Sequence, residues 1–213
     1  MRPFILVLAG VNGAGKSSVL STLLLDQGLD WFNPDRYAAE LARKLGISLD
    51  EANGVAWRHG KSLLEEAIAR GNNYAFETTL GGTTITRLLR QASQTHDLLM
   101  LYCGLSSPEL HIARVAQRVA HQGHPIAEEK IRERWTTSRA NLVQLLPTLS
   151  RLQVFDNSHS VDPGDDIPDP ALVIELEGVR VLCPDVRSPS ALASVPGWAQ
   201  PILEAAIQRD ARP

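Results

Sequence analysis

The feature that most constrains this chain of 213 residues is a glycine-rich segment, residues 10–17, which follows a short apolar run. The run, residues 4–9, is typical of a strand buried on both faces, and residues 16–25 carry apolar side chains at helical spacing. Two glycines with four residues between them, followed by Lys-Ser between a strand and a helix, fit the phosphate-binding loop pattern. We therefore expect this segment to bind the phosphates of a nucleotide.

The residue types in this loop suit that chemistry. Backbone amides that wrap closely around a phosphate leave little room for side chains, which explains the glycines. Lys16 is expected to contact the outer phosphates, and the Ser17 hydroxyl is expected to bind magnesium. The predicted nucleotide-binding residues are Gly10, Asn12, Gly13, Ala14, Gly15, Lys16, Ser17 and Ser18. The pattern predicts ATP and Mg²⁺ as cofactors, but kinases, motors, GTPases and regulatory ATPases all share it.

Strand and helix patterns alternate after this loop. The predicted strands are residues 4–9, 30–33, 74–76, 98–102 and 152–155, and the predicted helices are 16–25, 35–45, 48–71, 83–92, 107–123 and 128–146. Such alternation requires crossover connections, which place helices on both faces of a parallel sheet. The prediction is therefore an α/β fold, a three-layer α/β/α P-loop NTPase with a mainly parallel five-stranded sheet.

The chain changes character near residue 158. Residues 158–170 are rich in Asp, Pro and Gly and predict a connection rather than a helix or strand. Beyond it, residues 171–176 and 179–182 predict a hairpin, and residues 198–207 a short helix. We expect a kinase-like domain over 1–158, with a helical lid around 106–146. Residues 159–213 are expected to form a linker and a small appendage packed on the same domain.

Composition excludes several classes of protein. A formal net charge of -3 argues against a generally basic nucleic-acid binder, and no apolar run approaches the ~20 residues of a membrane span. The N-terminus does not resemble a signal peptide. Two cysteines cannot form a disulfide framework, and aromatic residues make up only 5% of the chain. We expect a cytoplasmic protein with no nucleic-acid or membrane partner. Its core is expected to be mainly aliphatic, and Cys103 and Trp57 are expected to be buried in it.

Acidic side chains follow two of the predicted strands, at the edge where ligands of open parallel sheets bind. Asp35 follows the second strand in Asn33-Pro34-Asp35, and Glu77 follows the third, before Thr78. An Asp beside the γ-phosphate can deprotonate an acceptor hydroxyl, and a second carboxylate can hold the acceptor. The alternatives are that Asp35 is a helix N-cap and that Glu77 is an ordinary surface acid.

Thr83 or Thr84 is the predicted N-cap of the helix over residues 83–92.

Basic residues gather between residues 114 and 139. Phosphoryl transfer needs positive charge on the transferring oxygens, and a mobile lid often supplies it. The candidate residues are Arg114, Arg118, Arg132, Arg134 and Arg139. The alternative is that they pair with glutamates on solvated helix faces. His121 and His124 have no Cys or acidic partner at a metal-ligand spacing, so a metal role is not favoured for them.

Several separated motifs together resemble the zeta-toxin family of P-loop kinases, in its compact chromosomal form. These motifs are residues 10–17, 33–35, 76–79, 118–124, 131–135, 138–142 and 156–158. The resemblance implies that Asp35 activates the acceptor hydroxyl and that Glu77 and Thr78 contact the acceptor. It also implies that Arg118 and Arg134 hold phosphates and that the acceptor is a UDP-amino sugar. An antitoxin partner is a family property that one chain cannot reveal.

Three functions fit these observations. The first is an ATP-dependent kinase that phosphorylates a small molecule, with Lys16, Asp35, Arg118 and Arg134 as catalytic residues. The second is a nucleoside or nucleotide kinase, which needs only a different acceptor pocket. The third is a nucleotide-dependent regulatory ATPase or binding module. No clear acid at the end of a hydrophobic strand supports the third, although Asp156 could stand in for one.

Overall fold

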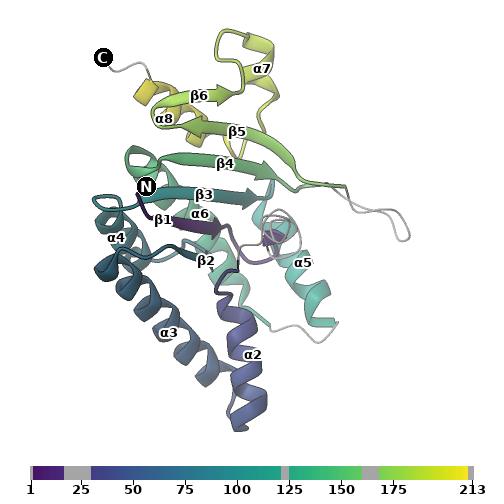
Figure 1. Cartoon of the computed structure of the whole chain (residues 1–213). Coiled ribbons are helices and arrows are strands. Elements are labelled where there is room, and N and C mark those ends of the chain that lie inside the picture. Colours follow the sequence, from purple (N-terminus) through teal and green to yellow (C-terminus); the bar gives the residue numbers. More distant parts are fainter. Residues whose placement is uncertain (1, 17–29, 121–124, 160–167, 211–213) are drawn as a thin grey trace.

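The computed structural model describes residues 2–16, 30–120, 125–159 and 168–210, which build a mixed sheet surrounded by helices (Figure 1). The strands are β1 Phe4–Ala9, β2 Tyr74–Thr78, β3 Asp97–Gly104, β4 Arg151–Asp156, β5 Ala171–Glu177 and β6 Arg180–Cys183. The helices are α2 Pro34–Leu45, α3 Leu49–Arg70, α4 Thr83–Ala92, α5 Pro108–Ala120, α6 Glu128–Leu145, α7 Pro189–Ser194 and α8 Gln200–Asp210, with a 3₁₀ turn at Leu146–Thr148. The predicted α/β P-loop NTPase fold is confirmed.

The strand order is β2-β1-β3-β4-β5-β6, and the first four of these strands are parallel. The chain runs from β1 to β2 on one side and then crosses to β3 on the other. Ligands of open α/β sheets bind at such a reversal, outside the carboxyl ends of the strands. Ala9 lies in register with Thr78 of β2 and Tyr102 of β3, so β1 and β2 end together and β3 ends two residues later. The topology therefore places the loop after β1 in the middle of this edge.

The strand predicted at residues 30–33 is reduced to a single parallel bridge between Phe32 and Phe76. Phe32 donates its N–H to the Ala75 carbonyl and accepts from the Glu77 N–H, at 2.9 Å in each case. Pro34 follows almost at once, and it has no N–H with which to extend a ladder. The consequence is that α2 begins immediately beside the end of β2.

The predicted hairpin is part of the main sheet. β5 pairs antiparallel with β4, and β6 pairs antiparallel with β5. The sheet is therefore mixed and has six strands, instead of the five mainly parallel strands expected. An antiparallel ladder offers every backbone group of an open strand edge a partner, so the hairpin covers the edge that β4 would otherwise expose.

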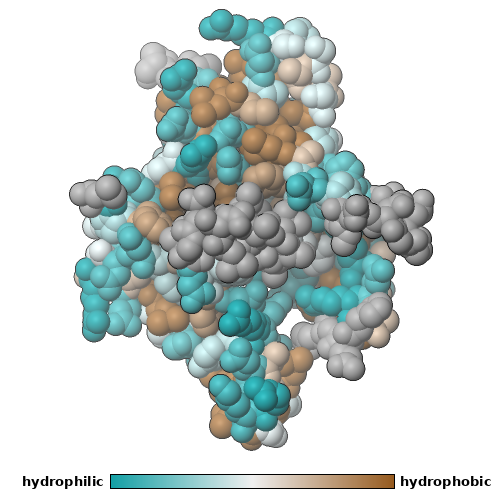
Figure 2. All heavy atoms as spheres, turned by 45° about the vertical axis from the view of Figure 1, so that its right-hand side comes forward, coloured by the Kyte–Doolittle hydropathy of each residue, from teal (hydrophilic) through white to brown (hydrophobic). Residues whose placement is uncertain are grey.

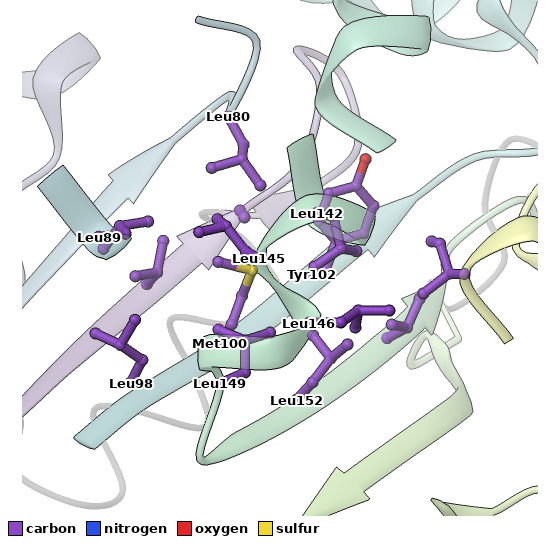
Figure 3. Packing of buried hydrophobic residues seen from close by; sticks show 14 of the residues in the cluster. Leu80, Leu89, Leu98, Met100, Tyr102, Leu142, Leu145, Leu146, Leu149 and Leu152 are labelled. Atoms are coloured by element: carbon purple, nitrogen blue, oxygen red, sulfur yellow. The ribbon is translucent and has the colours of Figure 1, made fainter. Parts of the chain in front are cut away.

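The core is aliphatic, as the composition predicts. Ile5, Val7 and Ala9 point into a large cluster on one face of the sheet, whereas Leu6 and Leu8 belong to a cluster on the other face. This alternation is the period of two expected of a strand covered on both sides. Side chains from α3, α4, α6 and α8 complete the larger cluster, and Figure 3 shows the part where α6 packs over β3 and β4.

Several local sequence signals have the expected effect. Ser48 and Glu51 form the capping box of α3, and Gly46 and Gly71 end α2 and α3 in the left-handed conformation. The predicted caps of α4 are wrong: Gly82 occupies the N-cap position, and no side chain caps this helix. α7 was not expected at all. Beyond Lys16, the predicted helix over 16–25 lies outside the described residues.

Two tryptophans lie differently from the expectation. Trp57 was predicted to be a core residue, but it is 50% exposed on α3. Trp198, predicted to begin the last helix, precedes α8 and is buried against Gly104, where an added Cβ would lie 2.3 Å from its ring. Cys103 is fully buried, as predicted.

The surface is mostly polar, with apolar side chains gathered in places. In Figure 2 hydrophobic residues are visible in the upper part of the view, the end of the molecule that carries the β5–β6 hairpin. The exposed large apolar side chains of this region are Leu172, Val179, Leu182 and Val186. No helix in the described ranges has both the length and the apolar character that a bilayer crossing requires.

Candidate active site

The glycine-rich loop after β1 has backbone conformations that require glycine. Gly10 and Gly13 have φ of 142° and 81°, and Gly15 has φ of 88°. A Cβ on Gly10 would lie 2.2 Å from the Cys103 carbonyl oxygen, and one on Gly13 would lie 2.9 Å from that of His111. The loop therefore lies directly on β3 and α5, and only glycine permits that approach. Ser17 and Ser18, predicted to bind magnesium and nucleotide, lie outside the described residues.

Buried polar groups hold the back of this loop. The Ala14 carbonyl accepts hydrogen bonds from the Cys103 thiol at 3.0 Å and from Asn157 Nδ2 at 2.9 Å. Burial raises the pKa of the Cys103 thiol to about 12, so the thiol remains protonated and can donate. His111 Nδ1 lies 2.8 Å from the Asn12 carbonyl, and burial lowers the pKa of His111 to about 4. His111 is therefore neutral at pH 7 and donates to the loop, a role for which the sequence offered no signal.

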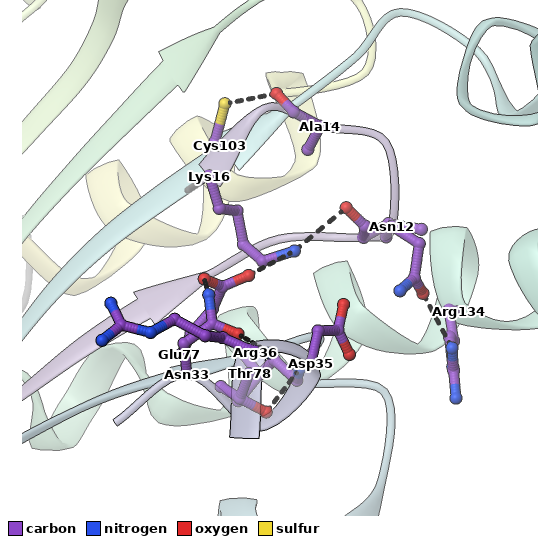
Figure 4. A network of polar contacts seen from close by, with 12 residues as sticks. Asn12, Ala14, Lys16, Asn33, Asp35, Arg36, Glu77, Thr78, Cys103 and Arg134 are labelled. Carbon is purple, nitrogen blue, oxygen red and sulfur yellow. Dashed lines mark hydrogen bonds and ion pairs between the residues drawn. The ribbon is translucent and has the colours of Figure 1, made fainter. Parts of the chain in front are cut away.

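The phosphate-loop lysine and an acidic side chain meet at the front of the loop (Figure 4). Lys16 Nζ lies 3.5 Å from Glu77 Oε1 and donates to the Val11 carbonyl at 3.3 Å. Both side chains are more than nine-tenths buried, so the alternative that Glu77 is an ordinary surface acid is wrong. A buried carboxylate is stable only when it is paired, and Lys16 supplies a counter-charge.

Asn33 joins Glu77 to the start of α2. Its Nδ2 donates to Glu77 Oε2 at 2.8 Å, and its Oδ1 accepts from the Arg36 N–H at 3.0 Å. Asn33, not Asp35, is thus the N-cap of α2. The Asp35 side chain is 64% exposed and lies in the first turn of the helix, where it lines the cavity described below.

The two arginines predicted to hold phosphates lie on different helices, Arg118 on α5 and Arg134 on α6. Arg134 Nη1 donates to Asn12 Oδ1 at 2.7 Å, which ties α6 to the phosphate loop. Burial lowers the pKa of the Arg134 guanidinium, a sign that this charge is partly removed from water. Arg118 Nη1 lies 4.0 Å from Asp35 Oδ2, across the gap between α5 and α2. The sequence identified both arginines but not their partners.

The remaining basic residues of this segment have structural partners. Arg132 pairs with Glu109 at 2.6 Å on the surface, and Arg114 donates to the His159 carbonyl. Arg139 donates to the Trp135 and Trp198 carbonyls and lies over the Trp135 ring. Of these three arginines, only Arg132 pairs with a glutamate on a solvated helix face, as the alternative predicts, whereas Arg114 and Arg139 bond backbone carbonyls. His121 and His124 lie outside the described residues.

The strand-end residue Asp156 is also engaged. Its carboxylate accepts hydrogen bonds from Trp198 Nε1, at 3.0 Å, and from the Ser158 hydroxyl. This carboxylate therefore holds the segment before α8 against β4. Such a role does not favour Asp156 as the acid of a regulatory ATPase.

A cavity of about 720 Å³ opens beside the phosphate loop. Lys16, Asp35, Glu77 and Arg134 all line it, so four predicted site residues share one space. Other lining residues come from α3, from the loop after β2 and from the start of α6; they include Asn53, Trp57, Lys61, Thr78, Thr79, Gly81 and Lys130. The exposed ring of Trp57 forms part of this wall. The volume lies within the usual range for sites that bind small molecules.

The loop after β2 is held in an uncommon conformation. Leu80 is buried and has a φ of 54°, in the left-handed region that favours glycine. Its N–H donates to Thr78 Oγ1 at 3.1 Å, and its carbonyl accepts from Asn141 Nδ2 at 2.8 Å. Thr78, a predicted acceptor contact, thus also orders the loop through its hydroxyl oxygen.

The donor set of the site suits a magnesium ion that arrives with a nucleotide. Within the described ranges, no three His, Cys, Asp or Glu side chains gather closely enough to hold a metal by themselves. Magnesium in phosphoryl-transfer sites needs only one or two protein oxygens in addition to phosphates and water. Asp35 and Glu77 place carboxylate oxygens on the cavity wall, so the residues present fit this requirement.

Comparison with known proteins agrees with this geometry. Residues 5–145 match the AAA_33 family model, which describes an AAA domain. An uncharacterized protein of Haemophilus influenzae is 27% identical over 133 residues, which cover 59% of this chain and 88% of the relative.

Solved structures share the fold at low sequence identity. AvrRxo1-ORF1:AvrRxo1-ORF2 with sulphate ions matches with a TM-score of 0.62 at 16% identity, over 92% of this chain and 64% of that one. AvrRxo1-ORF1:-ORF2 with ATP matches with a TM-score of 0.56 at 16% identity, over 84% and 60%. The PezAT chromosomal toxin-antitoxin system of Streptococcus pneumoniae matches with a TM-score of 0.58 at 16% identity, over 98% and 85%. The chain thus spans less than two thirds of the AvrRxo1 chain.

Proposed function

Because the chain belongs to the AAA_33 family of P-loop domains, we propose that it is an ATP-dependent phosphotransferase. It transfers the γ-phosphate of ATP to a hydroxyl of a small acceptor. The observation that carries this proposal is the cavity shared by Lys16, Asp35, Glu77 and Arg134 beside the phosphate loop. A structure of similar fold, AvrRxo1-ORF1:-ORF2 with ATP, supports nucleotide binding.

The proposed step needs a base, positive charge and a place for the acceptor. The acceptor hydroxyl oxygen forms a bond to the γ-phosphorus while the bond from that phosphorus to the bridging oxygen breaks, and ADP leaves. Asp35 takes the hydroxyl proton, and its exposure leaves its carboxylate accessible to the acceptor. Lys16 and Arg134 stabilise the negative charge on the transferring oxygens, and Arg118 approaches from α5.

Glu77 and Thr78 are proposed to contact the acceptor. Their positions at the end of β2 and on the cavity wall support this role. Magnesium is proposed to be held by Ser17 and the phosphates, where it neutralises charge on the β- and γ-phosphoryl oxygens.

The motifs that resemble zeta toxins make a UDP-amino sugar the first acceptor to test. A nucleoside or nucleotide is the second candidate, and the exposed Trp57 ring in the cavity wall favours it because nucleobases stack on aromatic rings. In both cases the acceptor hydroxyl approaches Asp35 from the α3 side of the cavity.

The direct test is to incubate the protein with ATP, Mg²⁺ and a panel of acceptors and to analyse the products by mass spectrometry. The panel contains UDP-N-acetylglucosamine, nucleosides and nucleoside monophosphates. A product heavier by one phosphoryl group is expected with one of these acceptors. ATP binding with slow hydrolysis, and no phosphorylated acceptor, would instead favour a regulatory ATPase or binding module.

The role of Asp35 is tested by Asp35→Asn, which keeps the size of the side chain and removes the base. We expect product formation to fall by about a hundredfold or more, the usual contribution of a general base. Glu40→Gln is the matched control, because Glu40 is an exposed carboxylate of the same helix, paired with Arg36 and Lys44. Equal activity of Asp35→Asn and Glu40→Gln would show that Asp35 is not the base.

A further inference from the structure

Asn33 is an N-cap whose side chain has both of its polar ends engaged. The carbonyl end caps α2, and the amide end donates to Glu77. The two partners show which end of the amide is which. The Arg36 N–H can only donate, so it faces Oδ1, and the Glu77 carboxylate accepts, so it faces Nδ2. A single side chain therefore connects Glu77 with the helix turn that carries Asp35.

Glu77 needs this connection most when a nucleotide is present. One carboxylate oxygen lies 3.5 Å from Lys16 and the other lies 2.8 Å from Asn33. A phosphate-loop lysine contacts the outer phosphates of a bound nucleotide, so Lys16 has to turn away from Glu77 when ATP binds. The bond from Asn33 does not depend on Lys16 and can persist.

We propose that Asn33 is a positioning residue that holds the Glu77 carboxylate toward the acceptor while Lys16 engages ATP. The expected effect on phosphate transfer rests on the proposed phosphotransferase function. The position of the Glu77 carboxylate does not depend on that function. Asn33 also sets the place of Asp35, two residues further along the same capped turn. The two acids of the site thus share one structural anchor.

The choice of residue agrees with this role. Serine and aspartate cap helices about as well as asparagine. The caps of α3 and α7 in this chain are serines, Ser48 and Ser188. Aspartate has no donor and would add a like charge beside Glu77, and the serine hydroxyl, although it can donate, lies one bond closer to the backbone than the asparagine amide. Asparagine satisfies both requirements at position 33.

The first experiment is a crystal structure of Asn33→Ser with a non-hydrolysable ATP analogue, compared with the wild-type protein in the same state. Serine preserves the cap and removes the amide that donates to Glu77, because its hydroxyl lies one bond closer to the backbone than the Asn33 Nδ2. We expect the Glu77 carboxylate to stay beside residue 33 in the wild type and to move by more than about 1 Å in the variant, a displacement that can cost a hundredfold in rate. An unmoved carboxylate in Asn33→Ser overturns the inference, whatever the activity.

The second experiment measures kinetics with the acceptor probe UDP-N-acetylglucosamine and, separately, nucleotide binding. Asn33→Ser should lower kcat/KM for the acceptor about tenfold to a hundredfold, the effect of one hydrogen bond to a charged group. The Kd of a fluorescent ATP analogue should change less than threefold. In a Glu77→Gln background, Asn33→Ser should add little further loss, because both changes disturb the same group.

Ser188→Ala is the matched control for the loss of a cap, because Ser188 caps α7 at the other end of the molecule. It should lower the melting temperature slightly and leave transfer unchanged. Additive losses from Asn33→Ser and Glu77→Gln would contradict a shared role. If the wild type transfers no phosphate while Glu77 moves in Asn33→Ser, the proposed function fails and the positioning role stands.

Discussion

At the scale of single residues, the site consists of side chains that each have two partners or two tasks. Lys16 contacts Glu77 and the loop backbone, Asn33 caps α2 and binds Glu77, and Thr78 orders its own loop while it lines the cavity. Residues with a second partner are held in one orientation, which is what a catalytic group requires. Lys16 and Thr78 were predicted as site residues and Asn33 was not, and the partners of all three were missed.

His111 gives the protein a specific dependence of stability on pH. Burial lowers its pKa to about 4, below its usual value near 6.5. Between these two values the unfolded chain binds more protons than the folded one, so stability falls as the pH drops from 6.5 toward 4. His111→Gln keeps an amide donor for Asn12 and does not titrate. We expect this variant to lose about 2–3 kcal/mol less stability than the wild type between pH 7 and 4.5.

The measurement is the free energy of unfolding from urea titrations at both pH values. Both proteins also lose stability at low pH because their carboxylates become protonated. This loss is the same in the two proteins and cancels in the comparison. An identical loss in His111→Gln and the wild type would mean that His111 titrates normally in the folded protein.

At the scale of elements, α6 joins both sides of the site. Its residue Arg134 contacts Asn12 of the phosphate loop, and Asn141 contacts the carbonyls of Leu80 and Gly82 in the loop after β2. Its last turns are buried in the core, including Leu142 and Leu145. A helical lid over 106–146 remains a prediction, but the carboxyl-terminal half of α6 is part of the scaffold.

Asn141→Ala tests this connection. The change removes the 2.8 Å bond to the Leu80 carbonyl and a longer contact to the Gly82 carbonyl, which Thr86 Oγ1 still bonds. It also frees a segment that contains the left-handed Leu80. We expect a loss of about 1–3 kcal/mol in the free energy of unfolding, measured with urea. A higher KM for the acceptor should accompany it, because Thr78 and Thr79 lie in the same loop.

The control for this prediction is Gln144→Ala on the same helix. Gln144 accepts a hydrogen bond from Arg90 on the surface, and loss of an exposed contact usually changes stability by less than about 0.5 kcal/mol. A similar loss in the free energy of unfolding in the two variants would indicate that Asn141 stabilises only its own helix and not the loop after β2.

At the scale of the whole molecule, the C-terminal residues belong to the same sheet as the phosphate loop. β5 extends the sheet beyond β4, and Trp198 packs over Gly104 at the end of β3. Trp198 also donates to Asp156, whose neighbour Asn157 binds the phosphate loop at Ala14. The division into residues 1–158 and 159–213 remains a prediction, and these contacts oppose a loosely attached appendage.

Gly104→Ala tests how tightly this region is packed. The new Cβ would overlap the Trp198 ring, so we expect a loss of about 1–3 kcal/mol in the free energy of unfolding, the usual cost of overpacking. In a Trp198→Ala background the same change should cost much less, since the ring is gone. Gly197→Ala is the control, because nothing lies within 4 Å of its Cβ position. Equal costs in both backgrounds would contradict the packing argument.

The sequence by itself determined the parts of this protein that depend on local chemistry. The glycines of the phosphate loop, the cap at Ser48 and the apolar run of β1 follow from backbone sterics, hydrogen bonding and burial, which act over a few residues. These local rules were enough for the fold class and for the choice of Lys16, Asp35 and Glu77 as candidates, whereas the choice of Arg134 came from the resemblance to zeta toxins. Residue types that suit phosphates and acceptor hydroxyls are recognisable without coordinates.

Only the tertiary structure decided which of these residues meet. Glu77 contacts Asn33, 44 positions earlier, and Arg134 contacts Asn12, 122 positions away. The hairpin joined the main sheet because β4 offered an open edge, and Trp57 lines a cavity because α3 turns its ring toward the site instead of the core. Such pairings depend on how distant segments pack, and periodicity within one segment carries no information about them.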